Sequence, residues 1–247
     1  MSGPTRRELL GSLLGFALVE ALWSRELLAA KARPVLGPWF KELAEMTRDL
    51  RGRRMLDLEF QDRMEDLYRR VDLAALVELV DLEVLAKRML LPARGAIGQG
   101  VELRGLAGLP AELGFTRQIF ACGKGRSIVP HGHNNLVSGF IVLKGRWRGR
   151  HYERLETHAD HFVIRPTIDR AFGPGDLSTI SDHRDNVHWF QAESDTAFIF
   201  NVHVSGIDPS QRRSSGRLYL DPGGEPRPDG TIRAPKLSWA DCHDKYG

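Results

Sequence analysis

The sequence predicts a mainly β protein in which a barrel of short strands follows a helical extension. From about residue 97 onward, short runs rich in Val, Ile, Phe, Tyr and Trp alternate with Gly, Pro, Asp and Asn. No long helical pattern separates these runs, and regular short strands of this kind favour an antiparallel sandwich or barrel. Residues 40–91 instead place apolar side chains at helical spacing. We therefore expect helices first and a β-barrel after them.

The composition is that of an ordinary globular protein. The chain has 247 residues, enough for one large domain or for one domain with a helical extension. Lys and Arg number 35 against 32 Asp and Glu, and the two signs are interleaved along the chain. This pattern is typical of a solvated surface and argues against a nucleic-acid partner. Two cysteines, Cys122 and Cys242, make no disulfide framework, and whether they are free stays open.

The first residues resemble a signal for export. Arg6 and Arg7 precede an apolar stretch over residues 13–22, and residues 30–32 form a small-x-small cleavage site. The pattern resembles a twin-arginine signal peptide, which implies that residues 1–32 contact the twin-arginine export machinery and that the mature protein is periplasmic or secreted. The alternative is an N-terminal helix in a cytoplasmic protein, because charged residues interrupt the apolar stretch.

Residues 33–95 are expected to form a helical extension that contributes no catalytic or metal-binding residue. Phe60 and Met64 belong to a series of apolar residues at helical spacing. Asp72 and Asp81 each precede a short apolar run and suit the N-caps of two short helices.

The barrel is expected over residues 96–220, followed by a loop-rich tail over residues 221–247. The six candidate strand segments are residues 116–122, 140–156, 161–168, 177–181, 187–193 and 196–206.

Three of the nine histidines form a coherent set. His131 and His133 stand two residues apart in an apolar stretch, and side chains at that spacing on a strand point to the same face. His188 follows a turn-rich segment and opens a later strand. We predict that these three histidines bind one divalent metal ion. His203 stays uncertain because it shares a strand face with Asn201, and the remaining histidines are interpreted as dispersed surface groups: His151, His158, His161, His183 and His243.

The segment that contains the histidine pair resembles the first motif of the cupin family, with Gly125 before the pair and Gly145 after it. The stretch GPGDLSTISDHRDNVHWF resembles the second motif. This resemblance implies a double-stranded β-helix, or jelly-roll barrel, with metal ligands at its mouth. Cupins usually carry a Glu four or five residues after the second histidine of the pair, where this chain has Val137 and Ser138.

A three-histidine site without a carboxylate is similar to that of the thiol dioxygenases, namely cysteine dioxygenase, cysteamine dioxygenase and plant cysteine oxidase. The match covers residues 115–205 and sets Tyr152 and Glu153 at a Tyr-Asp position and Asn201 at or next to an Asp position. It implies Fe²⁺, O2, and a small-molecule thiol or N-terminal-cysteine peptide as substrate. Tyr152 is the candidate to donate a hydrogen bond to the reacting oxygen, with a plain strand aromatic as the alternative. Asn201 is the second candidate catalytic residue, although an amide cannot act as a general base.

The donor set alone leaves other functions open. Three histidines also describe a catalytic zinc site, so a Zn²⁺ or Mn²⁺ hydrolase or isomerase is one alternative. A non-catalytic ligand-binding or sensing protein is the other. A small thiol that carries a carboxylate would need an arginine in the pocket, and the candidates on plausible strands are Arg117, Arg148 and Arg150.

Overall fold

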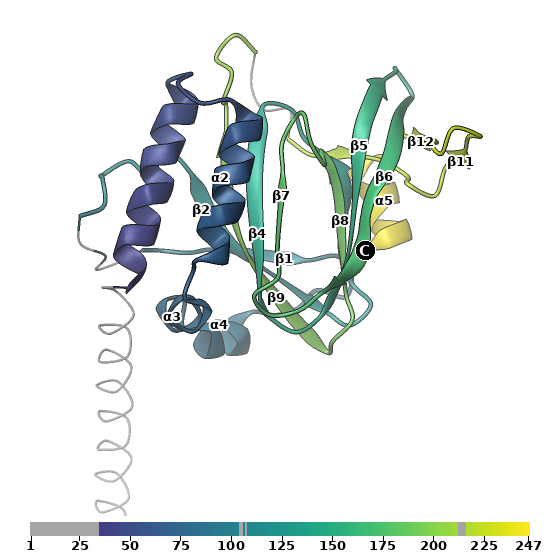
Figure 1. Ribbon diagram of the computed structural model, residues 1–247. Helices are drawn as coiled ribbons and strands as arrows, with labels where there is room; N and C mark the ends of the chain where they lie inside the picture. Colours follow the sequence, from purple (N-terminus) through teal and green to yellow (C-terminus); the bar gives the residue numbers. More distant parts are fainter. Residues whose placement is uncertain (1–34, 104–105, 107, 212–215) are drawn as a thin grey trace, which may run out of the picture.

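Two antiparallel sheets face each other, and helices cover the outer face of one of them (Figure 1). The computed structural model describes residues 35–103, 106, 108–211 and 216–247. The expected signal peptide, residues 1–32, lies outside the described residues. Within the described part of the chain, no helix has the length and hydropathy needed to cross a membrane.

The five-stranded sheet has the order β1-β2-β9-β4-β7 and the seven-stranded sheet has the order β10-β3-β8-β5-β6-β12-β11. The strands of the five-stranded sheet are β1 (Ile97–Gly100), β2 (Thr116–Gly123), β9 (Thr196–Ser205), β4 (Leu136–Lys144) and β7 (Leu177–Ile180). The strands of the seven-stranded sheet are β10 (Leu218–Tyr219), β3 (Ser127–Gly132), β8 (Val187–Ala192), β5 (Trp147–Thr157), β6 (His161–Phe172), β12 (Ile232–Pro235) and β11 (Glu225–Pro226).

The order of the strands identifies the fold. From β2 to β9 the chain passes back and forth between the sheets, so that β2, β9, β4 and β7 face β3, β8, β5 and β6. This is the double-sheet jelly roll, also called the double-stranded β-helix, which is the barrel of the cupin fold. The fold class predicted from the sequence, a mainly β jelly roll after N-terminal helices, is confirmed.

The helical extension packs on the five-stranded sheet. It comprises a helix over the described residues 35–51, then α2 (Asp57–Arg69), α3 (Leu73–Leu79) and α4 (Leu82–Arg88). Asp72 caps α3 as expected, because its side chain accepts a hydrogen bond from the Ala75 amide. Asp81 takes the N-cap position of α4 in the left-handed conformation, without a capping bond from its side chain.

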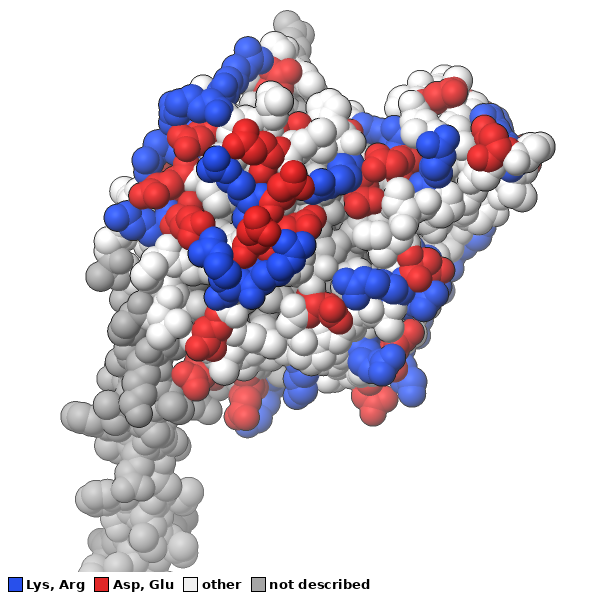
Figure 2. All heavy atoms as spheres, viewed as in Figure 1, with Lys and Arg blue, Asp and Glu red and all other residues white. Residues whose placement is uncertain are grey.

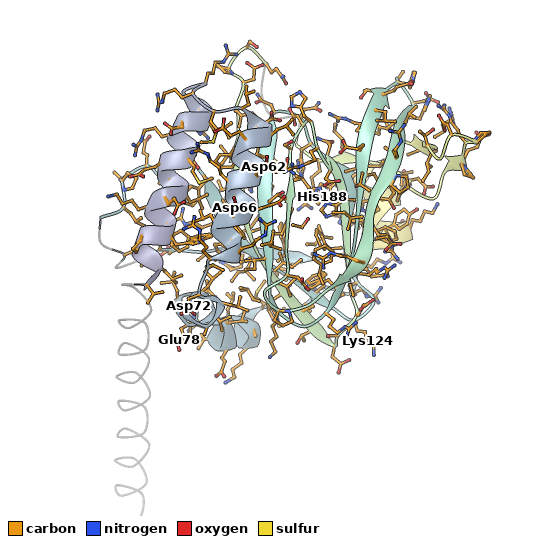
Figure 3. All side chains as sticks on the ribbon, viewed as in Figure 1. Asp62, Asp66, Asp72, Glu78, Lys124 and His188 are labelled. Carbon is orange, nitrogen blue, oxygen red and sulfur yellow. The ribbon has the colours of Figure 1, made fainter. Side chains whose placement is uncertain are left out.

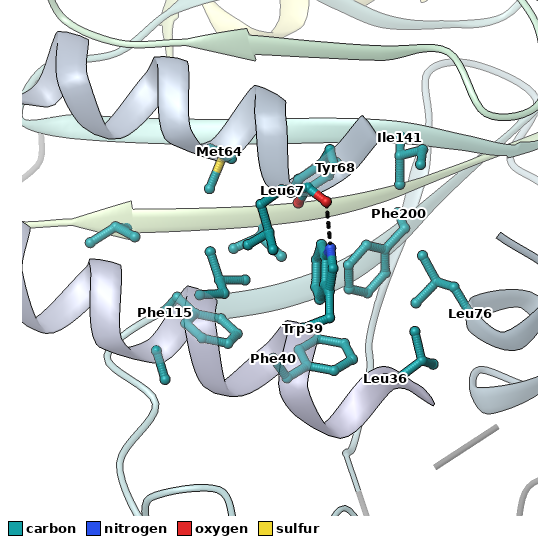
Figure 4. Close-up of a cluster of buried hydrophobic side chains, with 14 of the residues drawn as sticks. Leu36, Trp39, Phe40, Met64, Leu67, Tyr68, Leu76, Phe115, Ile141 and Phe200 are labelled. Atoms are coloured by element: carbon teal, nitrogen blue, oxygen red, sulfur yellow. Dashed lines mark hydrogen bonds between the residues drawn. The ribbon is translucent and has the colours of Figure 1, made fainter. Parts of the chain in front are cut away.

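The two larger hydrophobic clusters of the described residues follow from this arrangement. Figure 4 shows part of the first, which lies between the helices and the five-stranded sheet; there Trp39 stacks edge-on against Phe40 and donates a hydrogen bond of 2.8 Å to the Leu67 carbonyl. The second core fills the barrel between the two sheets and includes Trp147 and Phe190. The cavity described below opens above this second core.

The outer surface of the helices is charged but mixed in sign. Lys and Arg alternate with Asp and Glu over this face (Figure 2), and ion pairs such as Arg70–Glu42 at 2.6 Å and Arg184–Asp62 at 2.7 Å neutralise them locally. Exposed pairs of this kind stabilise a fold only slightly. The helical face therefore offers no concentrated charge of one sign.

The C-terminal segment, expected as a loop-rich tail, contains strands β11 and β12 and the helix α5 (Trp239–Tyr246). Strand β12 extends the seven-stranded sheet by pairing with β6, whereas α5 packs against β3, where the Cys242 thiol donates to the Pro130 carbonyl. Both cysteines are free and buried, and burial raises the pKa of Cys122 to about 12 and that of Cys242 to about 11.

Gly145 lies in the turn between β4 and β5 and is required there by its conformation and its surroundings. Its φ of +79° lies in the left-handed region, and a Cβ on it would lie 2.6 Å from the Thr196 carbonyl oxygen. We expect Gly145→Ala to lower the free energy of unfolding by about 2 kcal/mol or more, measured by urea unfolding. Gly125→Ala is the matched control, because Gly125 has φ +76° but open space around its Cβ. Equal losses in the two variants would show that the steric contact at Gly145 contributes nothing.

Candidate metal centre

Three histidine side chains meet between the sheets at the mouth of the barrel. His131 belongs to β3, His133 follows directly after that strand, and His188 lies on β8 opposite His131 in the strand register. One nitrogen from each ring lies within 4.8 Å of the other two. The ring centroids are 4.2 Å apart for His131 and His188 and 4.8 Å for His131 and His133. Figure 3 shows His188 between the two sheets. The structure thus brings together the three histidines that the sequence selects.

Backbone carbonyls orient the rings. The Nδ1 of His131 lies 2.7 Å from the Val129 carbonyl, and the Nδ1 of His133 lies 3.2 Å from the Gly216 carbonyl. A carbonyl can only accept, so Nδ1 carries the hydrogen in both rings and Nε2 keeps its lone pair. This is the arrangement in which a histidine holds a metal ion through one nitrogen while the other is fixed by a hydrogen bond.

Burial keeps the three imidazoles neutral. It is the largest cause that lowers the pKa of each ring, to about 3 for His133 and well below the usual 6.5 for His131 and His188. The positive charge of the Arg217 guanidinium acts in the same direction on all three. Since a metal ion requires the neutral imidazole, these rings are in the correct protonation state at pH 7. Their number, burial and free nitrogens fit a divalent transition-metal ion.

Asn186 links the loops that carry the ligands. Its Nδ2 donates to the His133 carbonyl at 2.9 Å and to the Ser181 carbonyl at 3.1 Å. Its Oδ1 lies 3.4 Å from the His133 amide nitrogen and accepts its hydrogen. The side chain is buried, so these bonds form without competition from water. Asn186, which directly precedes β8, therefore fixes the backbone at His133 from a position two residues before His188.

Replacing Asn186 with alanine is expected to weaken metal binding by about 10- to 100-fold, as is usual when a group that positions a ligand is lost. Competition with a chromophoric chelator would measure the affinity. Asn134→Ala is the control. Asn134 directly follows His133 in the chain, but its side chain accepts a hydrogen bond from Arg154 and not from the His133 backbone. Unchanged metal affinity in Asn186→Ala would contradict this role.

A cavity of about 240 Å³ adjoins the three histidines. Its apolar lining comes from Phe120, Ile128, Leu136 and Phe140. Its other lining residues, besides the three histidines, are Gln118, Ser138, Asn201, His203, Ser205, Gly216 and Arg217. No Asp, Glu or Cys is found among the described residues that line it. The cavity therefore combines a candidate metal site with space for a small molecule.

Asn201, a predicted site residue, does line this cavity. It is buried on β9, and its Nδ2 donates to the Ser138 hydroxyl at 2.7 Å. Its Oδ1 accepts a hydrogen bond of 3.1 Å from the Gln118 side chain and lies 3.4 Å from the Nδ1 of His203. The amide thus organises the polar wall opposite the three histidines.

Tyr152 lies elsewhere, and its proposed placement beside the metal requires correction. It pairs with Val187 on β8 and packs in an outer cluster that includes Phe162 and Leu220, beneath the C-terminal segment. Successive side chains of a strand point to opposite faces, and on β5 it is His151 that faces the barrel interior. Tyr152 therefore points away from the barrel interior, and its neighbour His151 points toward it.

His151, interpreted from the sequence as a surface group, is fully buried. It lies opposite His188 in the strand register, its ring centroid is 6.3 Å from that of His188, and its Nε2 lies 3.0 Å from the Ser178 hydroxyl. Burial lowers the pKa of His151 to about 3. The alternation of Trp147 and His151 with arginines along β5 is the sequence signal that could have identified it.

The arginines selected from the sequence also lie outside the cavity. Arg148 and Arg150 contact Asp169 of β6, with N–O distances of 2.5 and 3.5 Å, and Arg117 is not among the lining residues. The arginine that does line the cavity is Arg217, which precedes β10 and which sequence reasoning missed.

Comparison with known proteins adds only distant similarities. No family model matches the chain, and no curated protein does. Oxalate oxidase in complex with glycolate aligns at 16% identity and a TM-score of 0.36, over 52% of this chain and 56% of that chain. A protein from Klebsiella pneumoniae with a double-stranded β-helix domain aligns at 13% identity and 0.35, over 49% and 82%. A cupin sugar phosphate isomerase from Silicibacter pomeroyi aligns at 16% and 0.30, over 43% and 59%. This chain thus spans little more than half the length of the oxalate oxidase, and no activity is inferred from these similarities.

Proposed function

We propose that this protein is an iron-dependent dioxygenase that oxidises a thiol to its sulfinate. The observation that carries the proposal is the donor set: three neutral histidines converge on one point, and no acidic side chain is found among the described residues of the cavity. Three neutral ligands leave a divalent ion with its full charge, which favours the binding of a thiol as thiolate. Fe²⁺ held by His131, His133 and His188 would supply the redox chemistry through which a thiolate and O2 react.

The residue at the position of the usual cupin glutamate supports this view. Val137 packs in the core between the five-stranded sheet and the helices, whereas Ser138 faces the cavity. The Ser138 hydroxyl lies 3.0 Å from the Val202 carbonyl, to which it donates, and accepts the bond from Asn201. At the position where a cupin would have an anionic fourth ligand, this chain therefore has the uncharged Ser138, whose hydroxyl already forms two hydrogen bonds within the protein.

The overall reaction balances without a further reductant. A thiol and O2 give a sulfinate and one proton: the S–H and O–O bonds break, two S–O bonds form, and the four electrons lost by sulfur reduce O2. The proton is released to solvent, because burial and the Arg217 charge lower the pKa of the neighbouring His203 and make it a poor proton acceptor. Phe120 and Phe140 make part of the wall apolar, which limits the water around the sulfur.

Metal analysis followed by oxygen-uptake assays tests the proposal. The protein would be purified without a metal-affinity tag, loaded with Fe²⁺ under anaerobic conditions, and offered cysteine, cysteamine, mercaptopropionate and an N-terminal-cysteine peptide. We expect O2 uptake with at least one thiol and a sulfinate product by mass spectrometry. Iron-loaded protein that consumes no O2 with any of them would refute the proposal, and zinc as the resident metal would favour the hydrolase or isomerase alternative.

We also propose that the protein is exported in folded form through the twin-arginine route, on the basis of Arg6, Arg7 and the apolar stretch that follows. Replacing both arginines with lysine is expected to retain the precursor in the cytoplasm, which fractionation and immunoblotting would detect. Arg33→Lys, beyond the apolar stretch, is the control. Unchanged localisation of the double variant would exclude this route.

A further inference from the structure

Arg217 is a cation in the cavity without an anionic partner among the residues that the structure describes. It forms no hydrogen bond or ion pair with any of them, and its guanidinium carbon lies 5.5 Å from the ring centroid of Phe120, which also lines the cavity. Other arginines of the protein, such as Arg53 and Arg184, reach carboxylates at 2.6 and 2.7 Å. Partial burial of a guanidinium without a hydrogen-bond partner destabilises the folded protein, and a bound ligand that accepts its hydrogen bonds would remove this cost.

The fold places this arginine beside the metal ligands. Strand β10 pairs with β3, with Leu218 opposite Gly132 and Tyr219 opposite His131. Continuing this antiparallel register by one residue brings Arg217 next to His133, and the carbonyl of the preceding Gly216 lies 3.2 Å from the Nδ1 of His133. Arg217 is therefore held at the rim of the site by backbone pairing and not by its own side chain.

The charges of the cavity point to the class of its ligand. The histidines are neutral, no carboxylate is found among the described lining residues, and a divalent ion would add two further positive charges to that of Arg217. A planar guanidinium binds a carboxylate through two parallel hydrogen bonds. We infer that Arg217 binds the carboxylate of the molecule that occupies the cavity, so that the substrate is a small thiol acid. The thiol part of this assignment rests on the proposed function, whereas the acid part rests on Arg217.

Equilibrium binding to metal-free protein tests the acid part separately from catalysis. Isothermal titration calorimetry would compare 3-mercaptopropionate with 2-mercaptoethanol, which lacks the carboxylate, and with propionate, which lacks the thiol. We expect Arg217→Gln to weaken the binding of both acids by about 10- to 100-fold, the range for a hydrogen bond to a charged group, and to leave 2-mercaptoethanol unaffected. Arg217→Lys should retain part of the affinity for the acids, because it keeps the charge but loses the second hydrogen bond.

The control variant is Arg165→Gln. Arg165 is an exposed residue of β6 and does not line the cavity. We expect this variant to bind all three probes with the affinity of the unmodified protein. Equal affinity of Arg217→Gln and the unmodified protein for both acids would overturn the inference. If the iron-loaded protein consumes no O2 but acid binding still depends on Arg217, the thiol dioxygenase proposal fails and the anion site stands.

Discussion

His188→Ala is expected to abolish thiol oxidation and to leave the purified protein without stoichiometric iron. His188 supplies one of the three nitrogens from β8, whereas His131 lies on β3 and His133 directly after it. Two histidines that are two residues apart would remain, and they cannot enclose an ion from two sides. Iron content by plasma mass spectrometry and O2 uptake with the preferred thiol would measure the two effects.

His158→Ala is the matched control for this experiment. His158 lies near the tip of the β5–β6 hairpin, where its Nε2 contacts Glu156 at 2.7 Å, and its side chain is 44% exposed. This variant should keep both iron and activity. Circular dichroism would verify that His188→Ala still folds, and a folded His188→Ala protein that retains iron at the level of His158→Ala would contradict the three-histidine site.

The metal-free protein is expected to lose stability steeply as the pH falls below about 6.5. Four histidines have pKa values that burial lowers in the folded state: His131, His151 and His188 are buried, and His133 is half-buried. Below pH 6.5 the unfolded chain therefore binds protons that the folded protein does not, and stability decreases as pH decreases. With four such groups the slope reaches roughly 5 kcal/mol per pH unit. That is comparable to the whole stability of a typical domain, so the metal-free protein should unfold near pH 5.

Urea unfolding of the metal-free protein at a series of pH values would measure this slope. His183 acts in the opposite direction, because its bond to Asp57 raises its pKa, but it contributes only one proton. His151→Phe is the informative variant, since His151 packs against Phe172 and Phe190. It should reduce the slope by about a quarter. A stability that is unchanged between pH 7 and 5 would show that the buried rings gain protons without cost.

The sequence predicts the strands and the histidine triad because both depend on short-range patterns. The apolar runs along β4 and β9, and the two-residue spacing of His131 and His133, are visible without a structure. The assignment of Tyr152 was in error because periodicity separates the two faces of a strand but does not say which one is inside. Arg217 could not be identified, because its position depends on the pairing of β10 with β3, which are far apart in the sequence.

The covering of β3 by the C-terminal segment has a consequence for how the protein matures. The Cys242 thiol reaches the Pro130 carbonyl across 112 residues of chain, and the Ser127 hydroxyl reaches the Tyr246 carbonyl across 119. During synthesis the strand that carries His131 therefore emerges long before the segment that covers its outer side. Contacts between such distant parts of a chain form late and slowly. A nascent chain would thus display the histidine pair on an unsupported strand, and high-affinity metal capture should begin only after α5 has docked.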